Sequence, residues 1–313
     1  MSIAVPIVDL NDFFDPKSRD KFVQKLGDAF REFGFVRVAG HNVTPQITAP
    51  AYDVVKQFFA LPHGEKSKYI IHNGAGQRGY TPFLSESAKD SNIPDLKEFW
   101  HVGRELPPEH SLYDTYPPNI WPKEIKDFQS VLLTLYDELE KCSEVLLQAL
   151  ALYIGEDVSI FTNITKHGNS ILRSLYYPAL EGKEVIPGAI RAAPHEDINF
   201  ITLLIASTSN GLQILTQNQW VDVDAEPGEL IADAGDMLSR VTNGYIPSTT
   251  HRVINPDHTN EDRYSMPFFV HPRPDSILRV LQQFTGTNYP PPKPDITGID
   301  FLEERLYELG LKK

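Results

Sequence analysis

Cysteine is almost absent from this sequence, since Cys142 is the only one among 313 residues. A lone cysteine excludes an internal disulfide and a cysteine zinc site. Long apolar runs are missing too, because no stretch approaches the eighteen or so consecutive apolar residues of a membrane-spanning helix. The N-terminus MSIAVPIVDL lacks the basic stretch and apolar core of an export signal. These absences predict a soluble protein of a reducing cytoplasm.

Positive charge is also in short supply. The chain has 29 Lys and Arg against 42 Asp and Glu, a net charge of −13, and no basic cluster offsets the acidic excess. Such a surface repels nucleic acid and anionic membranes. We therefore expect neither of them as a partner, and we expect a monomer or a weak dimer.

Strand and helix patterns alternate in the first 60 residues. VPIVDL and FVRVAG indicate two strands, and the apolar stripe between them indicates a helix that stops at Gly34. Thr44 and Pro45 mark the start of a second helix, as an N-cap followed by a first-turn proline. Residues 72–98 are rich in Gly, Ser and Asp and predict a long loop, a candidate lid.

The longest helical pattern opens at Trp121-Pro122 and ends at Gly155. From about 170 to 280, short runs of β-branched and aromatic residues alternate with turn dipeptides, which is typical of a sandwich or barrel. A last amphipathic helix follows YPPPKP. We expect one mainly β domain with flanking helices, divided into a support region, a core and a C-terminal segment at 1–165, 166–280 and 281–313 of residues 1–313.

The stretch PHEDINFITLL places an imidazole and a carboxylate at the start of an apolar run. In an extended strand, residues i and i+2 share a face, so His195 and Asp197 would project toward one site. A histidine and an aspartate near a turn are also ordinary strand-edge residues. A second feature, His251 in a β-prone run 56 residues later, allows a third ligand to reach the same point. Two imidazoles and one carboxylate form the facial triad of non-haem iron(II) oxygenases, whereas structural zinc takes four protein ligands.

RYSMPFFV carries a second i, i+2 pair, twelve residues after His251. On a strand, the guanidinium of Arg263 and the hydroxyl of Ser265 face the same way and suit a carboxylate. A buried arginine needs an anion, which is either a ligand or a neighbouring acidic side chain. Arg78, Arg173 and Arg191 are weaker candidates for an anionic substrate, with salt bridges as the alternative. We interpret the remaining histidines as surface or loop residues: His41, His63, His72, His101, His110, His167, His258 and His271.

In order, His-x-Asp, the distant His and Arg-x-Ser resemble the isopenicillin N synthase-like family of iron(II)- and 2-oxoglutarate-dependent oxygenases. The resemblance extends over nearly the whole chain through VPIVDL, FREFGFVRVAGHNV, GYTPF, DLKEFW, LYYP and GDMLSRVTNGYIPSTTHRV. It implies a double-stranded β-helix, or jelly-roll, core. It also implies that His195, Asp197 and His251 hold Fe(II), and that Arg263 and Ser265 bind the distal carboxylate of 2-oxoglutarate.

Tyr177, in LYYP, falls where many relatives add a tyrosine hydroxyl to that carboxylate contact. Plant-type relatives have an asparagine two residues earlier, where this chain has Leu175. The triplet HED is also that of isopenicillin N synthase, which acts without 2-oxoglutarate and uses its Arg-x-Ser pair on a substrate carboxylate. The pair alone therefore leaves the cosubstrate open.

The resemblance implies an enzyme that uses O2 and 2-oxoglutarate to oxidise an unactivated C–H bond of a small molecule, by hydroxylation, desaturation or cyclisation. Succinate and carbon dioxide would be the co-products. Three alternatives remain at this point: an oxidase that does not use 2-oxoglutarate, a zinc hydrolase with the same triad, and a jelly-roll binding protein without catalysis.

Overall fold

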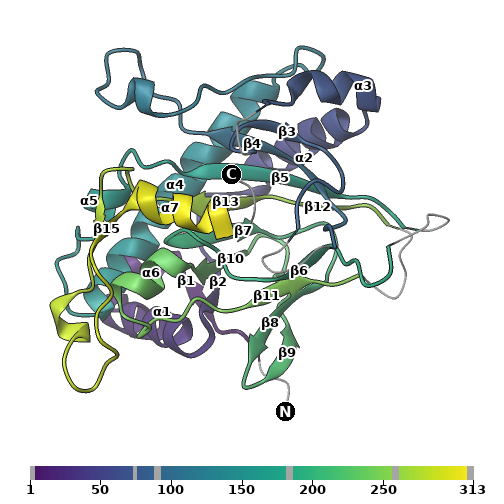
Figure 1. The fold of residues 1–313 in the computed structure, drawn as a ribbon. Coiled ribbons are helices and arrows are strands. Elements are labelled where there is room, and N and C mark those ends of the chain that lie inside the picture. The colour runs from purple at the N-terminus through teal and green to yellow at the C-terminus, as the bar shows by residue number, and fades with distance from the viewer. Residues whose placement is uncertain (1–3, 73–75, 88–92, 181–185, 256–260, 309–313) are drawn as a thin grey trace.

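A computed structural model describes residues 4–72, 76–87, 93–180, 186–255 and 261–308 (Figure 1). The helices are α1 (Arg19–Phe33), α2 (Pro45–Phe59), α3 (His63–Lys66), α4 (Phe128–Tyr153), α5 (Thr162–Thr165), α6 (Asp236–Val241) and α7 (Gly298–Glu308). The strands are β1 (Ile7–Asp9), β2 (Phe35–Ala39), β3 (Gly79–Thr81), β4 (Glu98–Gly103), β5 (Ile171–Tyr177), β6 (Ala192–His195), β7 (Ile201–Ile205), β8 (Leu212–Thr216), β9 (Gln219–Asp222), β10 (Leu230–Ala234), β11 (His251–Val253), β12 (Arg263–Ser265), β13 (Pro267–Val270), β14 (Ile277–Leu278) and β15 (Ile296–Thr297). Short 3-10 turns lie at Leu10–Phe13, Ser67–Tyr69, Tyr113–Thr115 and Gln282–Phe284.

Two sheets make up the body of the described fold (Figure 1). The larger runs in the order β1-β2-β10-β7-β13-β5-β4-β3, with β12 also paired to β5, and the smaller runs β6-β11-β8-β9. Apart from the parallel pair β1 and β2, the strands of both sheets pair antiparallel. This is the jelly-roll core that the sequence predicted, extended by strands from the N-terminal region.

The large sheet has two apolar faces because its strands alternate side chains between them. In β7, Ile201 and Leu203 belong to the core shared with α1, α2 and α4. Leu204 instead packs in a second core with Phe35 of β2 and Ile214 of β8, which lies between the two sheets. Thr202 points toward this second side, where it meets Asp197. The alternation therefore buries one face under helices and leaves the other to build a site.

Helix boundaries follow the local chemistry with one correction. Gly34 ends α1 in the left-handed conformation, with φ at 68°, as its position in the sequence predicted. The long helix begins at Phe128 and not at Trp121, because Asp127 also has a left-handed backbone, with φ at 60°, and interrupts the pattern. In the part of the chain that the structure describes, no helix is both long and apolar enough to cross a bilayer.

Residues 72–98 are less loop-like than predicted. β3 lies inside this range and β4 begins at its end, so the segment contributes an edge of the large sheet. The serines and aspartates that indicated a loop lie between the two strands, whereas Gly79 belongs to β3. Residues 73–75 and 88–92 of the segment lie outside the described chain.

Candidate active site

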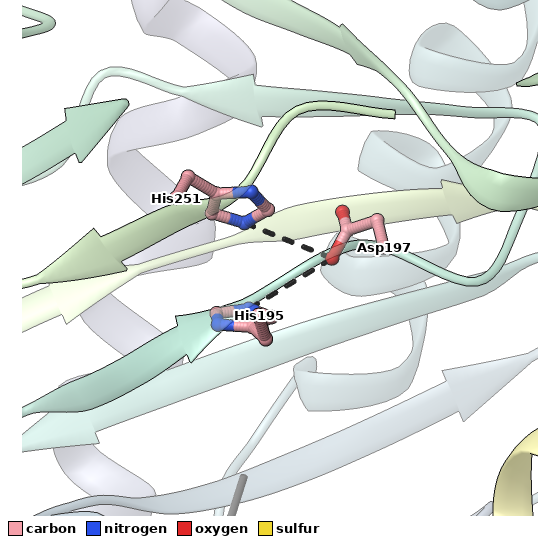
Figure 2. Close-up of side chains that lie close together, drawn as sticks. All are labelled: His195, Asp197 and His251. Atoms are coloured by element: carbon pink, nitrogen blue, oxygen red, sulfur yellow. Dashed lines mark ion pairs between the residues drawn. The ribbon is translucent and has the colours of Figure 1, made fainter. Parts of the chain in front are cut away.

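The structure brings His195, Asp197 and His251 together at one end of the small sheet (Figure 2). His195 ends β6, His251 begins β11, and the two are directly paired across these strands. Asp197 follows β6 after one intervening residue. One ligand atom from each side chain lies within 4.8 Å of the others. Asp197 Oδ1 is 3.9 Å from His195 Nε2 and 3.8 Å from His251 Nε2.

Backbone carbonyls fix which nitrogen of each imidazole faces the site. Nδ1 of His195 lies 2.7 Å from Ala193 O, and Nδ1 of His251 lies 3.1 Å from Thr249 O. A carbonyl only accepts, so both Nδ1 atoms carry hydrogen and both Nε2 lone pairs point toward Asp197. Burial and the neighbouring His251 lower the pKa of His195 to about 4. Its imidazole is therefore neutral at pH 7, which is the form that binds a metal.

The aspartate is held from both its side chain and its backbone. Thr202 Oγ1 donates a short hydrogen bond to Asp197 Oδ2, which leaves Oδ1 facing the imidazoles. Asp197 O accepts a hydrogen bond from Asp236 N at 2.7 Å. A Cβ on Gly235 would stand 2.9 Å from that carbonyl and 2.1 Å from Asn199 O, so only glycine allows the approach. The segment Gly235-Asp236-Met237 therefore holds in place the loop that carries the Asp197 carboxylate.

Arg263, Ser265 and Tyr177 gather on β12 and β5, where Arg263 and Tyr177 are cross-strand partners. Arg263 is 1% exposed and its Cζ lies 5.0 Å from the centre of the Tyr177 ring. Its Nε donates to Ser209 O at 3.0 Å, whereas its Nη1 is buried without a hydrogen-bond partner. Burial lowers the pKa of this guanidinium, and the neighbouring Tyr177 and Tyr52 oppose part of the shift.

A cavity of about 350 Å³ adjoins the triad, with His195 and Asp197 in its wall. Its other walls come from residues 70–71 and 76–87, from β4, β5 and β13, and from Leu302 and Leu306 of α7. The rings of Phe99 and Phe269 lie on either side of the Arg173 guanidinium, at 4.2 and 5.2 Å from its Cζ. The candidate lid and the C-terminal helix therefore border the space beside His195 and Asp197.

Charged side chains in this wall pair with one another. Lys97 Nζ lies 2.7 Å from Glu86 Oε2 and 2.8 Å from Asp95 Oδ2, and Arg173 Nη1 lies 3.4 Å from the same Glu86 oxygen. Burial alone would raise the pKa of Glu86, but the positive charges of Arg173 and Lys97 outweigh it and lower that pKa far below its usual range. We call Glu86, Asp95, Lys97 and Arg173 the lid cluster. Asp95 Oδ1 also accepts from Ala193 N at 3.0 Å, which ties the cluster to β6.

Two histidines that the sequence placed on the surface are buried here. His101 and His271 are 3% and 7% exposed and both line the cavity. Arg173 Nε donates to His101 Nε2 at 2.5 Å, so the hydrogen of His101 lies on Nδ1, which donates to Gly76 O. Nδ1 of His271 has no hydrogen-bond partner. The prediction for His101 was wrong because all six residues of β4 are buried. Charged residues next to His101 in the sequence therefore do not indicate an exposed position.

The three weaker arginine candidates make different contacts in the structure. Arg173 belongs to the lid cluster. Arg78 lines the cavity but bonds to two carbonyls and to Asn169 Oδ1 at 3.0 Å. Arg191 lies away from the cavity, near Tyr177, with its Cζ 6.0 Å from the ring centre. His258 lies outside the described residues.

Comparisons with known proteins agree with this architecture. Residues 5–124 match the family described as "non-haem dioxygenase in morphine synthesis N-terminal", and residues 168–272 match the 2OG-Fe(II) oxygenase superfamily. A 2-oxoglutarate-Fe(II) type oxidoreductase of Aspergillus fumigatus is 31% identical over 312 residues, which cover 96% of this chain and 92% of that protein.

Solved structures give the same result. A protein of Caulobacter crescentus assigned to the 2OG-Fe(II) oxygenase family is 37% identical and superposes with a TM-score of 0.88 over 98% of this chain and 99% of that one. A full-length Neurospora crassa protein, solved in complex with alpha-KG and thymine, is 27% identical with a TM-score of 0.84 over 97% and 96% of the two chains.

The chain belongs to the 2OG-Fe(II) oxygenase superfamily. It is an enzyme of the class that uses iron(II) and 2-oxoglutarate to oxidise small molecules with O2. Of the hypotheses left open by the sequence, the 2-oxoglutarate-dependent oxygenase is the one that these relatives support.

Proposed function

We propose that His195, Asp197 and His251 bind the iron of this oxygenase. The observation that carries the assignment is the convergence of two Nε2 lone pairs and Asp197 Oδ1 within 4.8 Å, with each Nδ1 hydrogen already donated to a carbonyl. One carboxylate and two imidazoles occupy three positions and leave the others to ligands, as a facial triad requires. When bound, iron and 2-oxoglutarate supply the oxidation of a substrate C–H bond by O2, with succinate and carbon dioxide as co-products.

We propose further that Arg263, Ser265 and Tyr177 bind the distal carboxylate of 2-oxoglutarate. An unpartnered Nη1 on a guanidinium that is 1% exposed supports this assignment, because a buried N–H group without an acceptor is costly and a carboxylate would satisfy it. Leu175, where plant-type relatives have asparagine, packs with Phe99 and Tyr177 and adds no polar contact of its own.

The chain's own residues position the proposed metal ligand. Thr202 holds Asp197 in one orientation, and Phe200, Leu203 and Phe268 are fully buried in the helix-covered core on the other face of the sheet, which fixes the segment that carries Thr202. We propose that the prime substrate is a small organic molecule that enters the cavity of about 350 Å³ between residues 76–87 and α7. Hydroxylation, desaturation and cyclisation are all compatible with this arrangement.

An anaerobic titration tests the metal assignment. Addition of Fe(II) and 2-oxoglutarate to the wild-type protein should give a visible charge-transfer absorption band and, in air, succinate. His251→Ala should lose the band and all turnover while keeping its far-UV circular dichroism and melting temperature. The matched control is His63→Ala, which removes an exposed imidazole on α3 and should behave as wild type. Full activity in His251→Ala would remove this histidine from the site.

A further inference from the structure

Arg191 is a second buried guanidinium close to the proposed carboxylate site. It immediately precedes β6, the strand that ends at His195, and it is 1% exposed. Its backbone N donates to Asn255 Oδ1 at 3.0 Å and its Nη2 donates to Glu261 O at 2.9 Å. Its Nε and Nη1 are buried without any hydrogen-bond partner. The fold therefore fixes the position of this side chain but provides a hydrogen-bond acceptor for only one of its three guanidinium nitrogens.

No carboxylate neutralises either guanidinium at close range within the described chain. Among the described residues neither Arg191 nor Arg263 takes part in an ion pair. Burial lowers the pKa of Arg191, and the nearby Asp262 and Glu261 oppose this effect without reversing it. Asp262 Oδ1 instead accepts a hydrogen bond from Ala179 N at 2.8 Å. Leaving a buried charge unpaired is strongly unfavourable, so a site of this kind calls for an anion.

The guanidinium groups of Arg191 and Arg263 both lie close to the ring of Tyr177. The Cζ of Arg263 lies 5.0 Å from the centre of the Tyr177 ring and the Cζ of Arg191 lies 6.0 Å from it. The two positive charges repel each other, and this repulsion adds to burial in lowering the pKa of Arg191. An anion that binds between the two guanidinium groups is attracted by both, and these attractions offset their mutual repulsion.

The strand direction supports the same location. β6 carries the metal ligand His195 at its far end and Arg191 just before its start. A ligand that reaches from the metal along β6 toward β12 therefore has a metal ligand at one end and two guanidinium groups at the other. 2-Oxoglutarate has that form, with a keto acid at one end and a carboxylate at the other.

We infer that Arg191 is a second cationic ligand for the distal carboxylate of 2-oxoglutarate, in addition to Arg263, Ser265 and Tyr177. The inference rests on the proposed function, and it assigns to Arg191 a role toward the cosubstrate that is distinct from binding of the prime substrate. Three buried donors without acceptors, Nη1 of Arg263 with Nε and Nη1 of Arg191, match the several lone pairs of one carboxylate. A ligand with two anionic ends is then favoured over one that lacks the distal charge.

Binding to the Mn(II)-loaded protein, measured by calorimetry without O2, tests this without turnover. The probes are 2-oxoglutarate and 2-oxovalerate, which has the same carbon chain with a methyl group in place of the distal carboxylate. Arg191→Met should raise the Kd for 2-oxoglutarate about ten-fold or more and leave the Kd for 2-oxovalerate within about two-fold. Arg191→Lys should fall between wild type and Arg191→Met.

Two controls separate the outcomes. Arg252→Met removes a half-buried arginine of the neighbouring β11, which bonds to Gln213 and lies over Trp220, and should leave both Kd values unchanged. Arg263→Met should weaken 2-oxoglutarate alone. An unchanged Kd for 2-oxoglutarate in Arg191→Met, or an equal loss for both probes, would overturn the role of Arg191. Failure of the wild-type protein to bind 2-oxoglutarate would instead overturn the proposed function itself. If Arg191→Met does not fold, Arg191→Lys carries the test alone, and equal affinity for 2-oxoglutarate would overturn the inference.

Discussion

Charged side chains are organised in opposite ways on the two sides of the triad of His195, Asp197 and His251. Beside the cavity, the carboxylates of Glu86 and Asp95 lie within 2.8 Å of Lys97 Nζ, so the lid cluster is neutralised by its own members. Near β12, Arg263 and Arg191 are each 1% exposed and have no carboxylate at ion-pair distance among the residues that the structure describes.

This difference shows what each group of charges does. A cluster that is already paired holds chain segments together, because each of its charges is compensated before any ligand arrives. A guanidinium that is buried and unpaired gains most from an incoming anion and adds little to the stability of the fold. Removal of a charge should therefore reduce stability on the cavity side and reduce ligand affinity on the other side.

Lys97→Met should give the largest effect on stability. It leaves the buried Asp95 and the partly buried Glu86 without their shared cation, and breaking a buried pair from one side costs about 3–5 kcal/mol of unfolding free energy. Urea denaturation at pH 7 measures this loss. The Kd for 2-oxoglutarate should stay close to that of wild type, and a stability equal to wild type would show that the cluster is not structural.

Arg263→Met should have the reverse effect. Loss of a charge-assisted contact worth about 1.5–3 kcal/mol should raise the 2-oxoglutarate concentration needed for half-maximal succinate formation by roughly ten- to a hundred-fold. Its urea midpoint should not fall, since an unpaired buried charge has been removed. An unchanged requirement would favour an oxidase that uses this arginine for a substrate carboxylate.

The unfolding free energy at acid pH tests whether Glu86 is paired in the folded protein. The folded-state pKa of Glu86 lies well below its usual range, so its contribution is present above about pH 4.5 and is lost as pH falls further. Glu86→Gln should therefore lose less stability than wild type between pH 5 and pH 3, as followed by urea unfolding at each pH. Parallel curves for the two proteins would contradict the paired state of this carboxylate.

Ser265→Ala should give the smallest change. It removes one neutral hydroxyl that is 2% exposed and lies on the same face of β12 as Arg263. A contact of about 1 kcal/mol corresponds to a roughly five-fold weaker binding of 2-oxoglutarate, measurable by calorimetry on the Mn(II)-loaded protein. A loss as large as that of Arg263→Met would mean that the hydroxyl, and not the guanidinium, dominates recognition of the carboxylate.

Period-two spacing explains how far the sequence could predict this site. Arg263 and Ser265 face one side of β12 as their i, i+2 spacing required, whereas β6 ends at His195 and Asp197 lies in the connection after it, where period-two alternation does not apply. The family resemblance supplied the jelly-roll core, and the strand pairing agrees with it.

The lid cluster could not be predicted from the sequence because its contacts join residues from separate segments. Glu86 and Lys97 come from the range predicted as a loop, and Arg173 comes from β5. His101 was read as a surface residue since a polar side chain in a strand buried on both faces has no local signature. Such pairings depend on which strand edge meets which loop, and no local pattern of residues encodes that choice.

The two carbonyls that accept the Nδ1 hydrogens also bear on how iron enters and leaves. With both imidazoles oriented by Ala193 O and Thr249 O, and Asp197 oriented by Thr202, the donor set is assembled by the polypeptide itself. Metal uptake then requires little further ordering of the chain. We therefore expect that a chelator yields a folded apoprotein that can be reconstituted with Fe(II).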